Sequence, residues 1–130
     1  MSATTQISND TLRRKRYCLT LDLKDDPVLI EEYKRLHQSG QIWPEIPTGM
    51  KEVGILNMEI YLLGTRMFMV IETEPDFDYD RQMMKLSKLP RQQEWEEFTW
   101  KFQNPLSAFG SGKKWMLMEN IYKLEQSAKQ

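Results

Sequence analysis

The order of the periodic segments along this chain constrains its fold more than any other sequence feature. Residues 16–23 alternate between apolar and polar side chains, which is the period of a strand with one buried face. A helical pattern occupies 26–38, and strand patterns return at 55–63 and 66–73. Because only Gly64-Thr65 separates the last two segments, we expect them to form a β-hairpin.

The rest of the chain adds one more helical region and one more strand. Residues 76–102 have a helical pattern that Pro90 divides in two, and residues 115–124 alternate again. The order strand, helix, strand, strand, helix, strand is typical of a ferredoxin-like α+β fold, with an antiparallel sheet and helices on one face. We therefore expect one domain over 15–126, preceded by a disordered tail over 1–14.

Local signals fix the ends of the first helix. Asp26 precedes Pro27, so a carboxylate can cap the unpaired amides while proline occupies a position that needs no amide hydrogen. Gly40 supplies a left-handed stop after the helix. A shorter helix is expected to end near Val53, where Gly54 follows.

Composition excludes several classes of partner and cofactor. The 130 residues include 18 Lys or Arg and 19 Asp or Glu, and this net charge of -1 provides no field for nucleic acid or an anionic membrane. The basic run at 13–16 is interpreted as a solvated tail. We also find no apolar span and no signal-peptide pattern in 1–12, so we expect a cytoplasmic protein without a membrane partner.

The cysteine and histidine content argues against a metal centre. One cysteine and one histidine form neither an internal disulfide nor a usual zinc site, which leaves open only a site of His37 and carboxylates. No H-E-x-x-H spacing surrounds that histidine. We therefore expect a protein with no metal and no other cofactor.

The two strands of the hairpin are apolar on both faces. Helices cover only one face of such a sheet, yet Phe68 and Val70 place apolar side chains on the other. This second face is expected to meet another subunit or to enclose a ligand. On the neighbouring strand Asn57, Glu59 and Tyr61 share one face, and their mixed character favours a pocket.

His37 is the first candidate for chemistry. It is the only side chain whose unperturbed pKa lies near neutrality, and it follows Tyr33 by four residues, so the two share a helix face. A ring at the border of the apolar stripe can line a pocket. The alternative is a surface or half-buried histidine without a role.

Two tryptophans are the next candidates. Trp43 and Glu45 flank a proline, and an aromatic ring beside a carboxylate is typical of carbohydrate sites, although on these residues alone we favour the alternative of an apolar plug at a chain break. Trp95 is followed by phenylalanines three and seven residues later, which is also ordinary core spacing. These residues alone predict a small α+β domain with a pocket and do not select a reaction.

Five segments resemble the L-rhamnose mutarotase family, and their sequences are most similar to the branch that is often assigned to L-fucose. They are KRYCLTLDLKDDPVLIEEYKRLH, IWPEI, NMEIYLLGTRMFMVIE, QEWEEFTWKFQ and KWMLMENIYKLE. The resemblance covers residues 15–125. Its most specific feature is the tyrosine and histidine four residues apart, followed by I-W-P-E.

The resemblance implies a homodimer in which two ferredoxin-like sheets face each other as a dimeric α/β barrel, with no metal or cofactor. It implies that His37 occupies the position of the catalytic proton donor, Tyr33 that of a substrate-binding tyrosine and Trp95 that of the first residue of a tryptophan pair. Two positions depart from the family. Glu96 replaces the second tryptophan, and Met58 stands where rhamnose-type members carry a tyrosine. Both departures bear on the identity of the sugar.

The predicted function is interconversion of the α and β anomers of a 6-deoxyhexose, L-fucose or L-rhamnose, by acid/base ring opening. His37 would supply the neutral-pH proton transfer. Tyr33, Glu45 or Glu59 would act opposite it, and Trp43, Trp95 and Tyr61 would complete the substrate site. The alternative is a non-catalytic small-ligand-binding barrel or a cofactor-free or haem-handling oxygenase-like protein, because fold does not fix function.

Overall fold

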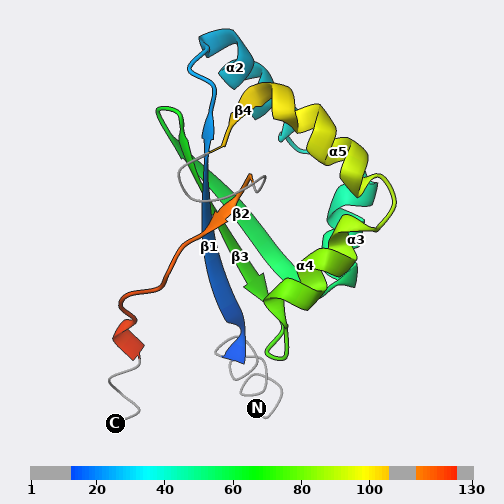
Figure 1. Ribbon diagram of the computed structural model, residues 1–130, viewed down its shortest axis with the longest axis vertical. Coiled ribbons are helices and arrows are strands. Elements are labelled where there is room, and N and C mark those ends of the chain that lie inside the picture. The colour runs from blue at the N-terminus through cyan, green and yellow to red at the C-terminus, as the bar shows by residue number, and fades with distance from the viewer. Residues whose placement is uncertain (1–12, 106–113, 126–130) are drawn as a thin grey trace.

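Helices arch over one side of a curled antiparallel sheet (Figure 1). The computed structural model describes residues 13–105 and 114–125. The elements follow in the order β1 (Lys15–Leu23), α2 (Pro27–Leu36), α3 (Glu45–Glu52), β2 (Ile55–Leu63), β3 (Arg66–Thr73), α4 (Tyr79–Ser87), α5 (Gln92–Thr99), the 3-10 helix η1 (Trp100–Phe102), β4 (Gln103–Asn104) and β5 (Met116–Leu117).

The sheet has the topology that the sequence pattern predicts. Its strands are ordered β2-β3-β1-β4, β5 also pairs with β1, and every pairing is antiparallel. This order places β1 and β3 at the centre, as in ferredoxin-like folds, so the predicted α+β class is confirmed. The predicted hairpin is also present, and Gly64 takes the positive φ of +62° that its tight turn requires.

The helix-facing side of the sheet carries two groups of buried residues. One group lies beneath α3 and α4 and consists of Leu19, Val53, Ile55, Ile71, Phe77 and Leu86. The other lies beneath α2 and η1 and consists of Leu21, Leu23, Tyr33, Met67 and Phe102. Trp115 packs against both groups. Members of both also line the cavity described below.

The start of α2 follows the local signals in the sequence. The Asp26 carboxylate accepts hydrogen bonds from the amides of Val28 and Leu29, and Pro27 is the first helical residue. This cap satisfies amides that have no intrahelical partner, which fixes where α2 leaves the end of β1. The helix ends at Leu36, so His37 is its C-cap residue.

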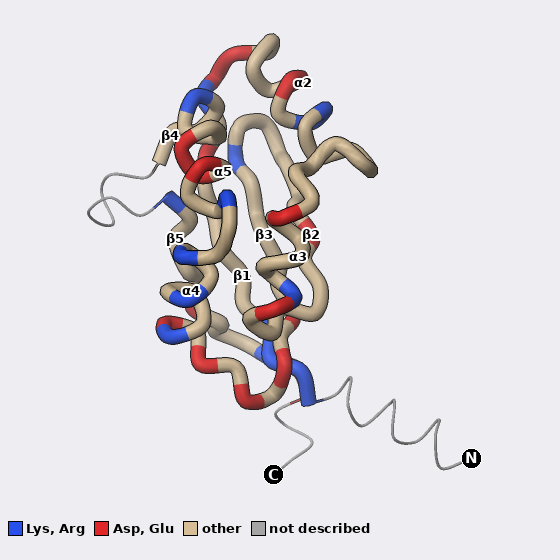
Figure 2. The backbone as a smooth tube through the Cα atoms, turned by 90° about the vertical axis from the view of Figure 1, so that its right-hand side faces the viewer, with Lys and Arg blue, Asp and Glu red and all other residues tan. Residues whose placement is uncertain are grey.

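The opposite face of the sheet carries no helix in the described residues (Figure 1). Phe68 and Val70 on β3 are only partly buried there. At the hairpin end Tyr61 is 56% exposed and Leu63 is 79% exposed. Figure 2 shows the helix side, where acidic and basic positions are interspersed and no single sign of charge dominates.

The fourth predicted strand is wrong in its length. Residues 115–124 alternate in sequence, but only Met116 and Leu117 pair with β1, and the chain then leaves the sheet (Figure 1). A last backbone bond joins the Met118 amide to the Cys18 carbonyl at 2.8 Å. Beyond it Ile121 is 88% exposed and Tyr122 is 64% exposed, so this stretch has the period of a strand without the surface that would bury it.

Some predictions fall partly outside the described residues, including most of the expected tail over 1–14 and the loop between β4 and β5. The second helical region begins at Tyr79 rather than at 76, because the Asp78 carboxylate caps it by accepting from the Arg81 amide. In the described part of the chain no helix is long and apolar enough to cross a membrane.

Candidate functional site

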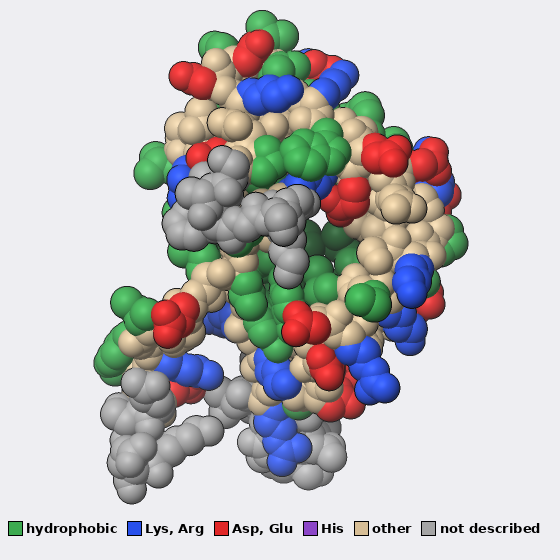
Figure 3. Space-filling view, in the orientation of Figure 1, with side chains coloured by type: hydrophobic (Ala, Val, Ile, Leu, Met, Phe, Trp, Pro, Cys, Tyr) green, Lys and Arg blue, Asp and Glu red, His purple; other side chains and the backbone are tan. Residues whose placement is uncertain are grey.

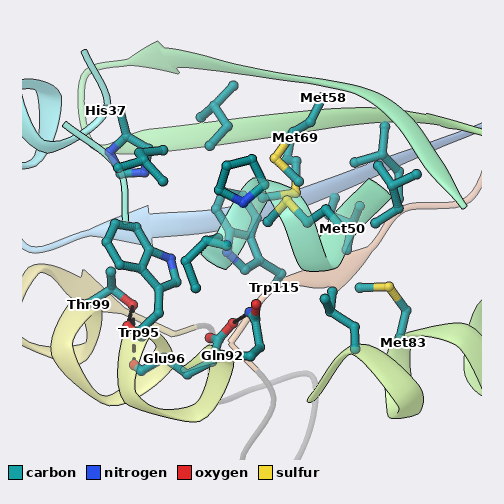
Figure 4. Close-up of a pocket in the computed structure, with 18 of the residues that line it drawn as sticks. His37, Met50, Met58, Met69, Met83, Gln92, Trp95, Glu96, Thr99 and Trp115 are labelled. Carbon is teal, nitrogen blue, oxygen red and sulfur yellow. Dashed lines mark hydrogen bonds between the residues drawn. The ribbon is translucent and has the colours of Figure 1, made fainter. Parts of the chain in front are cut away.

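A cavity of about 340 Å³ lies between the sheet and the helices. Figure 3 shows the hollow from its open side, with apolar side chains at its floor. In Figure 4, His37 and Trp95 lie at one end and Met83 at the other, with Met58 and Met69 projecting from the sheet. The volume is at the small end of the range for ligand pockets, which suits a monosaccharide-sized molecule.

His37 is oriented by the end of its own helix. Its Nδ1 lies 2.8 Å from the carbonyl oxygen of Tyr33, one turn earlier. A carbonyl only accepts, so Nδ1 carries the hydrogen and the neutral ring keeps its lone pair on Nε2. Burial lowers the pKa of His37, and the bond to Tyr33 opposes this only in part. The ring is therefore a neutral base at neutral pH.

Tyr33 brings a hydroxyl into the same cavity. Its side chain is 5% exposed, and its ring centroid lies 4.4 Å from that of His37. The Gln103 amide nitrogen donates to its hydroxyl oxygen at 3.3 Å. Burial raises the pKa of Tyr33 to about 12, so the phenol keeps its hydrogen at neutral pH and remains a donor.

Trp95 forms an aromatic wall beside these two residues. It is 7% exposed, and its ring meets His37 edge-on with the centroids 5.9 Å apart. Trp43 packs on the ring of Trp95 at 5.2 Å and carries the Arg91 guanidinium over its own ring at 4.1 Å. Trp43 is thus a support for Trp95 and does not line the cavity itself.

A polar edge runs along α5 in the lining of the cavity. The Glu96 carboxylate accepts from the Gln92 amide at 2.9 Å and from the Lys114 ammonium at 2.9 Å. Lys114 is only 9% exposed, and it also donates to the Glu96 carbonyl at 2.7 Å and to the Thr99 hydroxyl at 3.0 Å. The ammonium therefore fixes one carboxylate in the cavity wall.

The structure brings only some of the predicted site residues together. His37, Tyr33 and Trp95 line the cavity. Glu59 and Tyr61 do not, because strand alternation turns them to the other face of β2, where the Tyr61 hydroxyl donates to Glu59 at 2.8 Å.

Two further predicted positions lie outside the lining. Glu45 lies at the start of α3, 3.8 Å from the Arg91 guanidinium, and Trp43 lies behind Trp95 as described above. Asn57, which the alternation groups with Glu59 and Tyr61, does line the cavity. A register shift between Ile55 and Asn57 breaks the alternation at that point.

Several cavity residues were not selected from the sequence. Trp115 enters from the segment before β5, and Gln92 and Glu96 come from α5. Glu96 was recognised only as a departure from the family. The one available signal was the spacing of Gln92, Glu96 and Thr99 on the helix that carries Trp95. Within residues 13–105 and 114–125 no group of three or more His, Cys, Asp or Glu is arranged to hold a metal ion.

Fold and cavity together define a ferredoxin-like α+β protein with a cavity in which an imidazole, a buried phenol and a tryptophan converge. The chain belongs to the L-rhamnose mutarotase family, whose model matches residues 16–124. It is therefore an isomerase-type enzyme of carbohydrates, a sugar mutarotase.

Two relatives extend over most of the chain. An L-fucose mutarotase of Xanthomonas campestris pv. campestris is 34% identical over 113 residues, which cover 87% of this chain and 90% of the relative. A UPF0734 protein of Dictyostelium discoideum is 37% identical over 120 residues, covering 89% of this chain and 94% of that one.

Two solved structures share the fold. The L-rhamnose mutarotase of Formosa agariphila superposes with a TM-score of 0.63 at 17% identity, covering 85% of this chain and 99% of that one. The tetracenomycin F2 cyclase of Streptomyces glaucescens, a type-II polyketide cyclase, gives a TM-score of 0.56 at 18% identity, covering 84% and 95%. At these identities the likeness concerns the fold alone, and proteins of different activities share it.

Proposed function

We propose that the protein interconverts the α and β anomers of a 6-deoxyhexose, either L-fucose or L-rhamnose, with His37 as the proton-transfer residue. The observation that carries this proposal is the orientation of His37 by the Tyr33 carbonyl, inside a cavity that Trp95 also lines. The likeness to an L-fucose mutarotase supports the substrate class.

The chemistry needs one proton to move between two oxygens of the same carbon. Neutral His37 takes the proton of the anomeric hydroxyl at Nε2, the bond between C1 and the ring oxygen breaks, and C1 becomes an aldehyde. The imidazolium then gives the proton to the former ring oxygen, which restores the neutral ring. After rotation about the C1–C2 bond the same steps run in reverse and close the ring on the other face. A positioned acid/base of this kind typically contributes about 10²–10⁴-fold.

Tyr33 supports the departing ring oxygen as a hydrogen-bond donor. Its pKa of about 12 keeps the hydroxyl hydrogen in place, so it stabilises developing charge without being consumed. We prefer Tyr33 to Glu45 and Glu59 in this role, because neither carboxylate lines the cavity.

The remaining walls suit a deoxy sugar. Trp95 offers a flat ring for the C–H face of a pyranose, and Glu96 offers a carboxylate for its hydroxyls. Met58 and Met69 line the cavity from β2 and β3, and such a flexible apolar surface fits the C5 methyl group better than a hydroxymethyl group.

We also propose a homodimer that closes over the uncovered sheet face. Phe68 and Val70 remain partly exposed on that face, and Tyr61 and Leu63 are exposed at its edge. A second copy would bury these side chains and complete a dimeric α/β barrel. The cavity lies on the opposite, helix-covered side, so its described walls come from one chain.

Saturation transfer between the anomeric NMR signals tests the proposed reaction. Wild-type protein should accelerate exchange for L-fucose or L-rhamnose, and much less for D-glucose, at a pH and temperature where the uncatalysed exchange is slow. Binding of a deoxyhexose without any acceleration would favour the non-catalytic binding barrel instead. If the protein neither binds any of the three sugars nor accelerates their exchange, that result contradicts both functions.

A further inference from the structure

The side chain of Gln103 is buried in the wall of the cavity. The residue lies on β4, pairs with Leu23 of β1 and is 3% exposed. Its amide nitrogen donates to the Tyr33 hydroxyl, but its Oε1 has no hydrogen-bond partner in the part of the chain that the structure describes. The same side chain is among those that line the cavity.

A buried hydrogen-bond acceptor without a donor lowers the stability of the folded protein, so its presence calls for a reason other than folding. Leaving such an atom without a donor costs about 1–3 kcal/mol, and native proteins contain few of them. Other positions around this cavity carry methionine, leucine or isoleucine, which would avoid the cost. The amide at Gln103 is therefore expected to meet its donor in a bound molecule.

The neighbouring phenol restricts what that molecule must present. The Tyr33 hydroxyl already accepts from Gln103, so its own hydrogen is available to an acceptor in the cavity. A donor, the Tyr33 hydroxyl, and an acceptor, Gln103 Oε1, thus belong to two side chains that the 3.3 Å bond from Gln103 Nε2 to the Tyr33 oxygen holds together. Two oxygens on adjacent positions of a sugar, one accepting and one donating, complement this pair.

We propose that Gln103 is a specificity-determining residue whose Oε1 accepts a hydrogen bond from the C2 hydroxyl of the sugar. This inference rests on the proposed function, in which His37 and Tyr33 hold the oxygens on C1. The hydroxyl next to those oxygens is the one on C2, so it is expected to contact the Gln103 amide, which lies beside Tyr33. L-Fucose and L-rhamnose have opposite configurations at C2, so this contact discriminates between them.

The contact also predicts how strongly the site rejects an analogue. A site that places a buried acceptor against a substrate hydroxyl discriminates sharply against the molecule that lacks it, because the acceptor is again left unpaired. An apolar wall has no such effect. The 2-deoxy counterpart of the preferred sugar should therefore bind about 10-fold or more weakly to wild-type protein.

The test compares two sugars and three proteins. The sugars are whichever of L-fucose and L-rhamnose is turned over and its 2-deoxy counterpart. The proteins are wild type, Gln103→Met and the control Gln93→Met, which changes an exposed glutamine on α5. For each pair the KM and kcat of catalysed anomer exchange are measured above the spontaneous rate, together with the thermal midpoint.

Gln103→Met should raise KM for the parent sugar about 10-fold or more and leave KM for the 2-deoxy sugar near its wild-type value. Gln93→Met should change neither. A purely structural role of Gln103 would instead alter both sugars equally, and that result would overturn the proposal. If Gln103→Met does not fold, the wild-type comparison decides alone, because equal KM values for the two sugars also overturn it. Wild-type protein that is inactive on both L-fucose and L-rhamnose would refute the proposed function itself, whereas an active protein without C2 discrimination refutes only the role of Gln103.

Discussion

Replacing Lys114 by methionine is expected to destabilise the protein. The loss of its hydrogen bonds to two uncharged acceptors should matter more than the loss of its ion pair with Glu96. The ammonium is 9% exposed and donates to the Glu96 carbonyl, the Thr99 hydroxyl and the Glu96 carboxylate. Methionine keeps most of the apolar stem and removes all three donors. The Glu96 carbonyl then keeps the Thr99 hydroxyl as a donor at 3.2 Å, whereas the buried Thr99 hydroxyl oxygen loses the ammonium that donates to it.

The magnitude follows from how exposed each acceptor is. Leaving the buried Thr99 hydroxyl oxygen without a donor costs about 1–3 kcal/mol. The side chain of Glu96 is 44% exposed, so water screens its pairing with Lys114, and that part is worth about 0.2–1 kcal/mol. A total near 2 kcal/mol would lower the thermal midpoint of a domain of this size by roughly 6–10 °C.

A double-mutant cycle separates the two contributions. Urea unfolding is measured for wild type, Lys114→Met, Glu96→Gln and the double variant, with Lys85→Met at an exposed position of α4 as the control. We expect Lys114→Met to cost about 2 kcal/mol and the coupling energy to stay below about 1 kcal/mol. A coupling energy as large as the whole loss would refute this reasoning, and so would a Lys114→Met variant as stable as the control.

Three further predictions concern titration and assembly. Because burial lowers the pKa of His37 and the neutral ring is the active base, kcat/KM should stay level as pH falls to the ordinary histidine value of 6.5 and decline only below it; a decline centred at or above 6.5 in the pH profile would contradict this. Because burial raises the pKa of Tyr33 from 10.0 to about 12, only the unfolded chain ionises between these values, so stability should be full below pH 10 and fall as pH rises toward 12. Urea titrations should show this slope in wild type and a shallower one in Tyr33→Phe, and equal slopes would refute it. Sedimentation should find a dimer at micromolar concentration and a monomer for Phe68→Glu, whereas a monomeric wild type would remove the proposed interface.

The sequence predicts well those features that depend on neighbouring residues. The cap at Asp26, the hairpin around Gly64 and the order of the elements follow from local rules and appear in the structure. The shared helix face of Tyr33 and His37 is equally local, and it correctly brings both side chains to one cavity.

The features that the sequence does not predict depend on contacts between distant segments. Alternation alone does not reveal which face of β2 meets the helices, so Glu59 and Tyr61 were expected in the site although they lie on the other face. Glu96 gains its place through Lys114, which arrives from another part of the chain. Nothing in the sequence around Gln103 indicates a site residue, and only its burial beside Tyr33 in the structure does so.

Anomer exchange catalysed by His37→Asn tests the role of His37 most directly. Asparagine keeps a polar side chain at the end of α2 and removes the titrating ring, while Trp95 and the polar edge on α5 remain for binding. Saturation transfer should show exchange slowed by about 10²-fold or more, with sugar affinity changed by only a few-fold. Exchange at the wild-type rate in His37→Asn would contradict proton transfer by His37 and assign it to another group in the cavity.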